Sequence, residues 1–327
     1  MESAPAPGPH STEPPELGWR AHWRALRASA AAPGPVPPGG RWVRARYGLA
    51  QPFLGLRIIM RSSDLLGISL APAVGVLVVA GVVGYGTGAE HGIGRGLLAF
   101  LGAVAALAPL PSLLFGRVYA HMAAKARGHL GLSPQAPYLR GVTQVVGEWV
   151  AQLVILALGV LPWVALVRLV PGIGPVLALA LQGLWALHWT VVEGYDNART
   201  VPPGCTIAEL EAEGRRISAS PWFHRGYEAI EGVRVLSVVL HPMRMLSEVI
   251  VSLARPWRRE VDLVQEYPWV SLGFSLGVAA MLAVPGLNLL LRPAVVVAGV
   301  HLRHRLGIDI KTEAGRDAVA HPEPASA

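Results

Sequence analysis

Long runs without charge alternate with arginine-rich segments along the chain. The first uncharged run lies between Asp64 and Glu90, and the second covers residues 96–116. A helix needs about 20 apolar residues to cross the hydrocarbon core of a bilayer. The pattern therefore predicts two transmembrane helices, at 64–86 and 96–116, joined by a short polar link.

Two later apolar stretches, at 149–192 and 267–302, are interrupted near their centres by proline and glycine. Such residues end one helix and start another, which predicts two helical hairpins. Their structural tip residues are Pro171, Gly172 and Gly174 in the first hairpin and Pro285, Gly286 and Asn288 in the second. The arms of the second hairpin are short for a full span. We therefore expect hairpins that are re-entrant, leaving the membrane on the side from which they entered.

The remaining segments are polar or of biased composition. Residues 1–45 form an extension rich in Pro, Ala and Gly that is expected to be disordered. Within it, residues 16–30 could form a short interfacial helix that carries tryptophan and arginine. Residues 229–253 have apolar positions at helical spacing, which predicts an amphipathic helix on the membrane or against the helix bundle. Residues 307–327 read as a flexible tail, so that the membrane domain covers 46–306.

Composition agrees with a bilayer protein. Hydrophobic residues make up 52% of the chain and charged residues 15%, against about a quarter in a soluble domain. The net charge is +7, and 26 of the 28 basic residues are arginine. These arginines flank apolar runs instead of forming a patch interleaved with aromatic residues, which argues against a nucleic-acid partner and for topology charges.

The distribution of Arg and Lys also predicts the orientation. The first 61 residues carry eight, the link at 87–95 carries one, residues 117–148 carry four and residues 193–266 carry nine. Loops poor in positive charge face away from the cytoplasm. Both termini and the large polar region are therefore expected on the cytoplasmic side of a multi-pass protein.

Candidate chemistry is sparse. Arg168 and Arg292 lie within membrane segments, where a charge is a functional candidate. They could line an anion path, or they could snorkel to an interface or bond a carbonyl oxygen. The single cysteine, Cys205, excludes an intrachain disulfide, and no metal-spaced histidine pair, phosphate loop or serine elbow is present. We expect no cofactor, no metal and no enzyme activity.

Four motifs follow one another along residues 50–306. They are Pro52-Phe53-Leu54-Gly55-Leu56-Arg57 with Leu70-Ala71-Pro72, then Val170-Pro171-Gly172-Ile173-Gly174, then Trp185 to Glu193 with Tyr195-Asp196, and finally Val284-Pro285-Gly286-Leu287-Asn288 with Arg292-Pro293-Ala294. In their order and spacing these motifs resemble the CysZ-like sulfate permeases, which share a domain with the etoposide-induced membrane proteins. The resemblance implies two full transmembrane helices, two hemi-penetrating hairpins, a homo-oligomer, and sulfate uptake across the bacterial inner membrane.

One departure from the family pattern concerns its anion site. Family members are expected to bind sulfate at a Gly-apolar-Arg-Arg stretch that opens the first transmembrane helix. Here that stretch falls on Asp64-Leu65-Leu66-Gly67, where both arginines are missing and a carboxylate is present. Arg57 and Arg61, with Ser62 and Ser63 as donors, could substitute, because a helix N-terminus favours anions. They could equally be interfacial topology arginines.

The sequence therefore predicts an all-α integral membrane protein. Its first candidate function is that of a permease or channel-like protein for a small anion, sulfate by resemblance. The alternative is a non-transporting membrane scaffold or regulatory protein that acts through its polar region.

Overall fold

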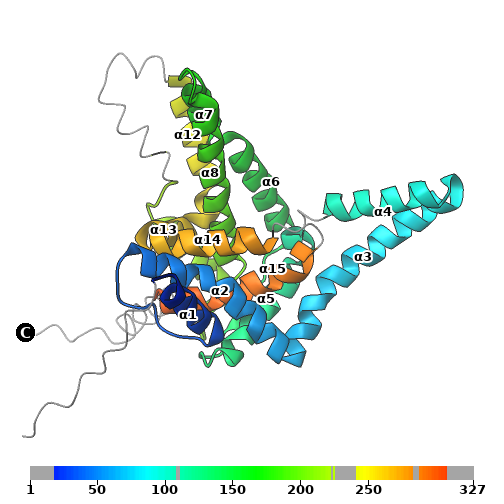
Figure 1. The fold of residues 1–327 in the computed structure, drawn as a ribbon, viewed down its shortest axis with the longest axis horizontal. Coiled ribbons are helices and arrows are strands. Elements are labelled where there is room, and N and C mark those ends of the chain that lie inside the picture. The colour runs from blue at the N-terminus through cyan, green and yellow to red at the C-terminus, as the bar shows by residue number, and fades with distance from the viewer. Residues whose placement is uncertain (1–17, 108–110, 222–223, 225–240, 283–286, 308–327) are drawn as a thin grey trace, which may run out of the picture.

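The computed structural model describes residues 18–107, 111–221, 224, 241–282 and 287–307, and these form helices almost throughout (Figure 1). The helices are α1 (Gly18–Ala31), α2 (Arg41–Arg61), α3 (Ser63–His91), α4 (Ile93–Leu107), α5 (Pro111–His129), α6 (Val142–Leu158), α7 (Leu161–Arg168), α8 (Gly174–Asp196), α9 (Ile207–Arg216), α12 (His241–Leu253), α13 (Arg258–Glu266), α14 (Pro268–Leu282) and α15 (Leu287–Arg305), with a 3-10 turn at Arg255–Trp257. Two short strands, β1 (Ala136–Pro137) and β2 (Thr200–Val201), pair antiparallel.

The centre of the molecule is formed by α2 packed between α14 and α15 (Figure 1). Glycines let these helices approach with their backbones in contact. A Cβ atom on Gly273 would lie 1.8 Å from the carbonyl oxygen of Ala45, and one on Gly55 would lie 2.1 Å from that of Ala294. Small residues at helix contacts are typical of membrane bundles, where close packing replaces the hydrophobic driving force.

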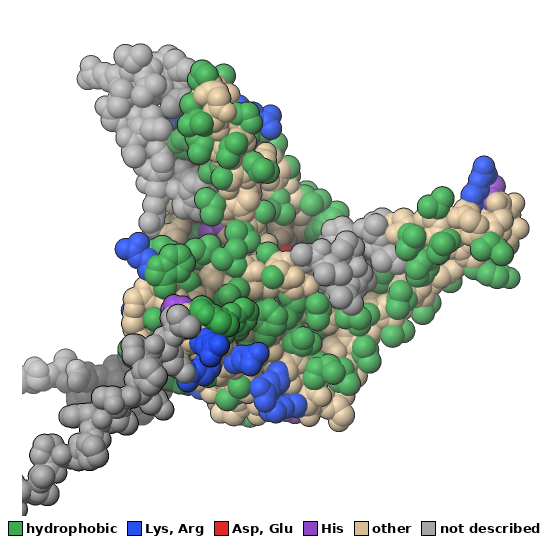
Figure 2. Space-filling view, in the orientation of Figure 1, with side chains coloured by type: hydrophobic (Ala, Val, Ile, Leu, Met, Phe, Trp, Pro, Cys, Tyr) green, Lys and Arg blue, Asp and Glu red, His purple; other side chains and the backbone are tan. Residues whose placement is uncertain are grey.

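Two helical hairpins project from this centre in different directions (Figure 1). One consists of α3 and α4, and the other of α6 and α7 followed by α8. Within the part of the chain that the structure describes, three helical segments are long and apolar enough to cross a membrane: Ser63–His91, Val142–Arg168 and Gly174–Asp196. Hydrophobic side chains cover the outside of both hairpins (Figure 2), for example Val82 at 68% and Leu179 at 71% exposure. An apolar surface of this extent is what lipid would cover, which supports an all-α membrane protein.

The first proline-glycine hairpin has its turn where the sequence predicts it. Leu169 to Ile173 separate α7 from α8, and Gly172 has a φ of +78°, which favours glycine. Gly174 opens α8, and a Cβ atom there would lie 2.7 Å from the carbonyl oxygen of Val167. The arms reach beyond 149–192, since α6 begins at Val142 and α8 ends at Asp196. Whether this hairpin spans the membrane or re-enters stays a prediction.

The second predicted hairpin corresponds to α14 and α15, which contact each other. Its tip residues Pro285 and Gly286 lie outside the described residues. Asn288 belongs to the first turn of α15, so the polypeptide is helical there. The re-entrant character of this hairpin also stays a prediction.

The predicted transmembrane helix at 96–116 corresponds to α4, described up to Leu107, and to the start of α5 at Pro111, while residues 108–110 lie outside the described part. The polypeptide is kinked at the end of this predicted span, because Phe115 has the non-helical angles φ −116° and ψ 16°. The first predicted span at 64–86 is longer than expected, since α3 runs from Ser63 to His91.

Two further boundaries differ from the prediction. The extension 1–45, expected to be disordered, contains α1 and the start of α2, which pack against each other. Of the amphipathic helix at 229–253, α12 covers 241–253, and the preceding residues lie outside the described part. Ile250 of α12 shares a buried cluster with Ile155 of α6. The described half of this helix therefore packs against the bundle.

Candidate functional site

The start of α3, where the resemblance would locate an anion site, holds an acid–base cluster. The Oγ atom of Ser62 lies 3.2 Å from Nδ1 of His129, and the carboxylate of Asp64 lies 3.2 Å from Nε2 of the same ring. Lys125 approaches Asp64 at 3.9 Å. These contacts join α3 to α5, so a carboxylate occupies the position where an anion would need positive charge.

The arginines predicted near this point do not converge. Arg57, Arg61 and Ser63 are exposed on the protein surface, whereas Ser62 is half-buried and lies within hydrogen-bond distance of His129. Nothing in this geometry singles them out from interfacial topology arginines. The anion site predicted at Arg57, Arg61, Ser62 and Ser63 is therefore not assembled by the described contacts.

The two arginines within the predicted hairpins also lie apart. Arg168 is exposed at the end of α7, whereas Arg292 of α15 forms an ion pair with Glu193 of α8. Glu193 lies 19 residues beyond Gly174, the first residue of α8. At 1.5 Å per residue, Glu193 is about 28 Å along the helix from the turn beside Arg168. The two arginines therefore do not form one binding site, and an anion path lined by both stays a prediction.

A buried network of ion pairs lies at the base of the long hairpin instead. Arg140, in the loop before α6, reaches Asp196 at the end of α8 at 2.7 Å. Arg199, just after α8, lies 3.0 Å from Asp196 and also pairs with Glu260 of α13. Arg303 of α15 reaches the same Glu260 at 2.7 Å. The network thus joins four segments that are far apart in the sequence.

Burial makes this network strongly coupled. Glu260 has no exposed surface, and burial alone would raise the pKa of its carboxyl group. The adjacent guanidinium groups of Arg199 and Arg303 outweigh that effect and hold the pKa well below its usual range, at about 2. Burial opposes the charge on Arg199, yet Glu260 and Asp196 raise the pKa of its guanidinium group above the usual value.

Tyr138 lies between two arginines of the network. It follows β1, Arg199 precedes β2, and the antiparallel pairing of Pro137 with Thr200 sets the two side chains opposite each other. Its ring centre is 5.3 Å from the guanidinium carbon of Arg140 and 5.4 Å from that of Arg199. Its hydroxyl group donates to Glu211 at 3.2 Å. Burial raises the pKa of Tyr138 to about 12, so the phenol is neutral.

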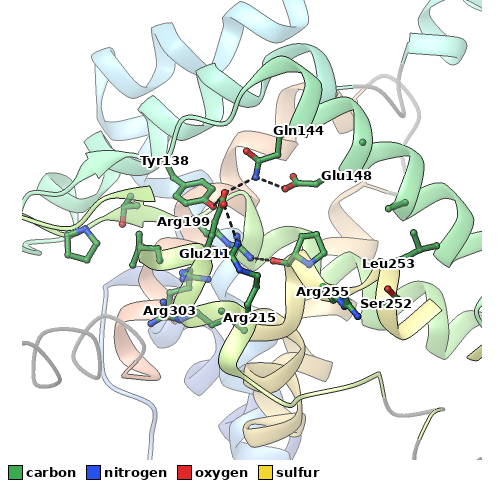
Figure 3. Close-up of a pocket in the computed structure, with 18 residues that line it drawn as sticks. Tyr138, Gln144, Glu148, Arg199, Glu211, Arg215, Ser252, Leu253, Arg255 and Arg303 are labelled. Atoms are coloured by element: carbon green, nitrogen blue, oxygen red, sulfur yellow. Dashed lines mark hydrogen bonds and ion pairs between the residues drawn. The ribbon is translucent and has the colours of Figure 1, made fainter. Parts of the chain in front are cut away.

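A cavity of about 460 Å³ opens beside this network (Figure 3). Its charged lining consists of Arg199, Arg215, Arg255, Arg259 and Arg303 against Glu148 and Glu211. The apolar part of the wall includes Leu210, Leu253 and Pro256. Glu260 pairs with Arg199 and Arg303, and Glu213 pairs with Arg259. The lining arginines that remain exposed to solvent are Arg215 and Arg255, and guanidinium groups in such a position attract anionic ligands.

A second cavity of about 210 Å³ shares Tyr138, Glu148 and Arg199 with the first. Arg117, Arg140 and Glu193 are among its other lining residues. In the shared wall, Arg140 donates to Glu148 at 2.5 Å, and Gln144 links Glu148 to Glu211. The two cavities are therefore neighbours separated by an aromatic ring and an ion pair.

Of the predicted anion-binding residues, only Arg292 comes near this region, through its partner Glu193. Sequence reasoning missed Tyr138 and the cavity arginines, and it quoted Glu193 and Asp196 only as carriers of the family resemblance. His188 of α8 is buried and packed between Trp185 and Trp189, with both ring centres 5.8 Å away. Within the described ranges, no group of three or more His, Cys, Asp or Glu side chains could hold a metal ion.

The chain was compared with models of protein families, with curated proteins and with solved structures, and none of the three comparisons found a match. The resemblance to CysZ-like permeases rests on the motifs quoted above and stays a prediction.

Proposed function

We propose that this protein is a permease or channel-like protein for a small anion, with sulfate as the first candidate from the resemblance. The observation that supports the proposal is the arginine-lined cavity at the base of an apolar hairpin (Figure 3). Rings of arginine select anions in membrane pores. The substrate-binding residues we propose are Arg255 and Arg215, both exposed side chains in the lining of that cavity.

The neighbouring cavity supplies the next step of the proposed path. An anion that leaves the larger cavity would meet Tyr138 and the Arg140–Glu148 ion pair, and Arg117 and Arg140 would receive it on the other side. A guanidinium group on this path would bind the anion and then return to its carboxylate partner. The anion is thereby held weakly enough to leave again, and conduction requires such weak binding. Without a nucleotide-binding motif in the sequence, the transport we propose is passive or driven by an ion gradient.

We further propose a homo-oligomer in a bacterial inner membrane, with both termini in the cytoplasm. The orientation is supported by the charge distribution, because the link at 87–95 carries one Arg and the polar segments on the other side carry many. The cavity would then face the cytoplasm, since its lining comes from the polar segments that flank the hairpin.

Uptake of labelled sulfate into proteoliposomes that contain the purified full chain tests the proposal. We expect uptake above that of empty vesicles, and an Arg255→Gln variant to reduce it about tenfold, the value of one charge-assisted hydrogen bond. Arg168→Gln is the matched control, since Arg168 is an exposed arginine outside the cavity. Uptake equal to that of empty vesicles across a range of pH would refute transport of sulfate.

The second candidate, a non-transporting scaffold or regulatory protein, is favoured by one observation. Arg168 lies at the end of the hairpin that is remote from Arg292 and its partner Glu193, so the two arginines do not form one anion site. Measurement of anion flux across the proteoliposome membrane distinguishes the permease from the non-transporting scaffold. If chloride, nitrate, phosphate and sulfate all fail to cross the proteoliposome membrane, the scaffold function gains.

A further inference from the structure

The N-terminal helices α1 and α2 are rich in arginine. Residues 18–61 contain eight arginines and no aspartate or glutamate. The same segment exposes three tryptophans: Trp19 at 59%, Trp23 at 57% and Trp42 at 77%. Figure 2 shows Lys and Arg side chains gathered over the region of α1 and α2. Large exposed indole rings among arginines mark a surface that has a partner.

These side chains form an open groove along α1. The groove has a volume of about 580 Å³ and is lined by Trp19, Arg20, Trp23, Arg24 and Arg27. The two tryptophans are four residues apart, and the three arginines are spaced by four and then three residues. Residues at such spacing lie on the same side of a helix, so each set runs along one side of α1. The guanidinium carbon of Arg20 lies 5.6 Å from the ring centre of Trp19. The groove therefore offers guanidinium donors above flat apolar rings.

The side of α1 that carries His22 holds the helix on the protein. Ala25 and Ser29, three and seven positions after His22, are half-buried, and α1 packs against α2. His22 is hydrogen-bonded to Arg46 of α2, and the Tyr47 hydroxyl group donates to the carbonyl oxygen of Gly34 in the connection, at 2.8 Å. The groove is therefore presented outward on a helix that is already fixed, and a ligand need not order it.

We propose that this groove binds the anionic headgroups of bilayer phospholipids. Guanidinium groups match phosphate oxygens in pairs, and tryptophan rings favour the depth of the headgroups. A chain inserted through its apolar hairpins keeps α1 close to a bilayer, so headgroups are the anions present at the highest effective concentration. The proposal does not depend on transport, because it concerns α1 and not the cavity.

The test uses the full chain reconstituted in nanodiscs. In a Cys205→Ser background, Ala28→Cys places one environment-sensitive fluorophore on an exposed position next to the arginines. We expect a blue shift when phosphatidylglycerol is added to phosphatidylcholine, and its loss in 0.5 M NaCl. Each arginine near an anionic surface contributes about fivefold to binding, so Arg20→Gln, Arg24→Gln and Arg27→Gln together should weaken docking about 100-fold.

The matched control removes the same charge elsewhere, through Arg95→Gln, Arg216→Gln and Arg244→Gln, all exposed positions outside the groove. It should leave the shift unchanged. Replacing the three groove arginines by lysine should retain most of it, which excludes misfolding as the cause of the loss. The proposal is overturned if wild type shows no response to phosphatidylglycerol, if both triple variants respond alike, or if millimolar inorganic phosphate or an RNA oligonucleotide displaces α1 from the lipid.

Discussion

Replacing Glu260 by glutamine tests the buried ion network most directly. Glu260 is fully buried and pairs with Arg199 and Arg303. The variant would leave two buried guanidinium groups short of negative charge, although Arg199 keeps Asp196. Breaking a buried pair from one side costs 3–5 kcal/mol, and we take about 3 kcal/mol because glutamine still accepts a hydrogen bond. At about 2 °C per kcal/mol, the Tm should fall by about 6 °C.

The assay is thermal unfolding of the detergent-purified chain, followed by tryptophan fluorescence. Glu248→Gln is the control, since Glu248 pairs with Arg244 at 2.9 Å and the two side chains are 55% and 51% exposed. An exposed pair of this kind contributes about 1 kcal/mol or less, so the Tm should change by about 2 °C at most. If Glu260→Gln unfolds no earlier than Glu248→Gln, the network does not stabilise the fold as reasoned here.

Three further outcomes follow from the geometry. The pKa of Glu260 is lowered from 4.5 to about 2. Its contribution to stability is therefore complete above pH 5 and is lost as the pH falls towards 2. Tm values measured over this pH range should show the loss in wild type and less of it in Glu260→Gln. Gly273→Ala should lower the Tm by several degrees, because the added Cβ would meet the Ala45 carbonyl oxygen at 1.8 Å, whereas Gly102→Ala meets nothing within 4 Å and should not. Gly172→Ala should cost about 1 kcal/mol in the same unfolding assay, because φ is +78° there; no loss would mean that the turn adopts another conformation.

The apolar elements were predictable because their signal is local. The uncharged run after Asp64 predicts α3, and the prolines and glycines between Val170 and Pro175 predict the turn between α7 and α8. Run length predicted a single straight helix at 96–116, and the kink at Phe115 could not be inferred from run length alone.

The site was not predictable in the same way, because its pairs depend on tertiary structure. Arg303 and Glu260 are 43 positions apart, and Arg140 and Asp196 are 56 apart. In the sequence these arginines look the same as those that set membrane topology. Only the packing of α13, α15 and the end of α8 distinguishes a buried ion partner from an interfacial charge.

The ion pairs at the foot of the long hairpin also have a mechanical consequence. Arg140 lies just before α6, the first helix of the hairpin, and pairs with Asp196, the last residue of α8. One guanidinium group therefore holds the two ends of the hairpin next to each other. The ion pair between Arg199 and Glu260 connects this end of the hairpin to α13. The hairpin is about 30 Å long and is held at its charged base. A tilt of ~10° about that base would displace its apolar tip by ~5 Å, while the ion pairs stay in place.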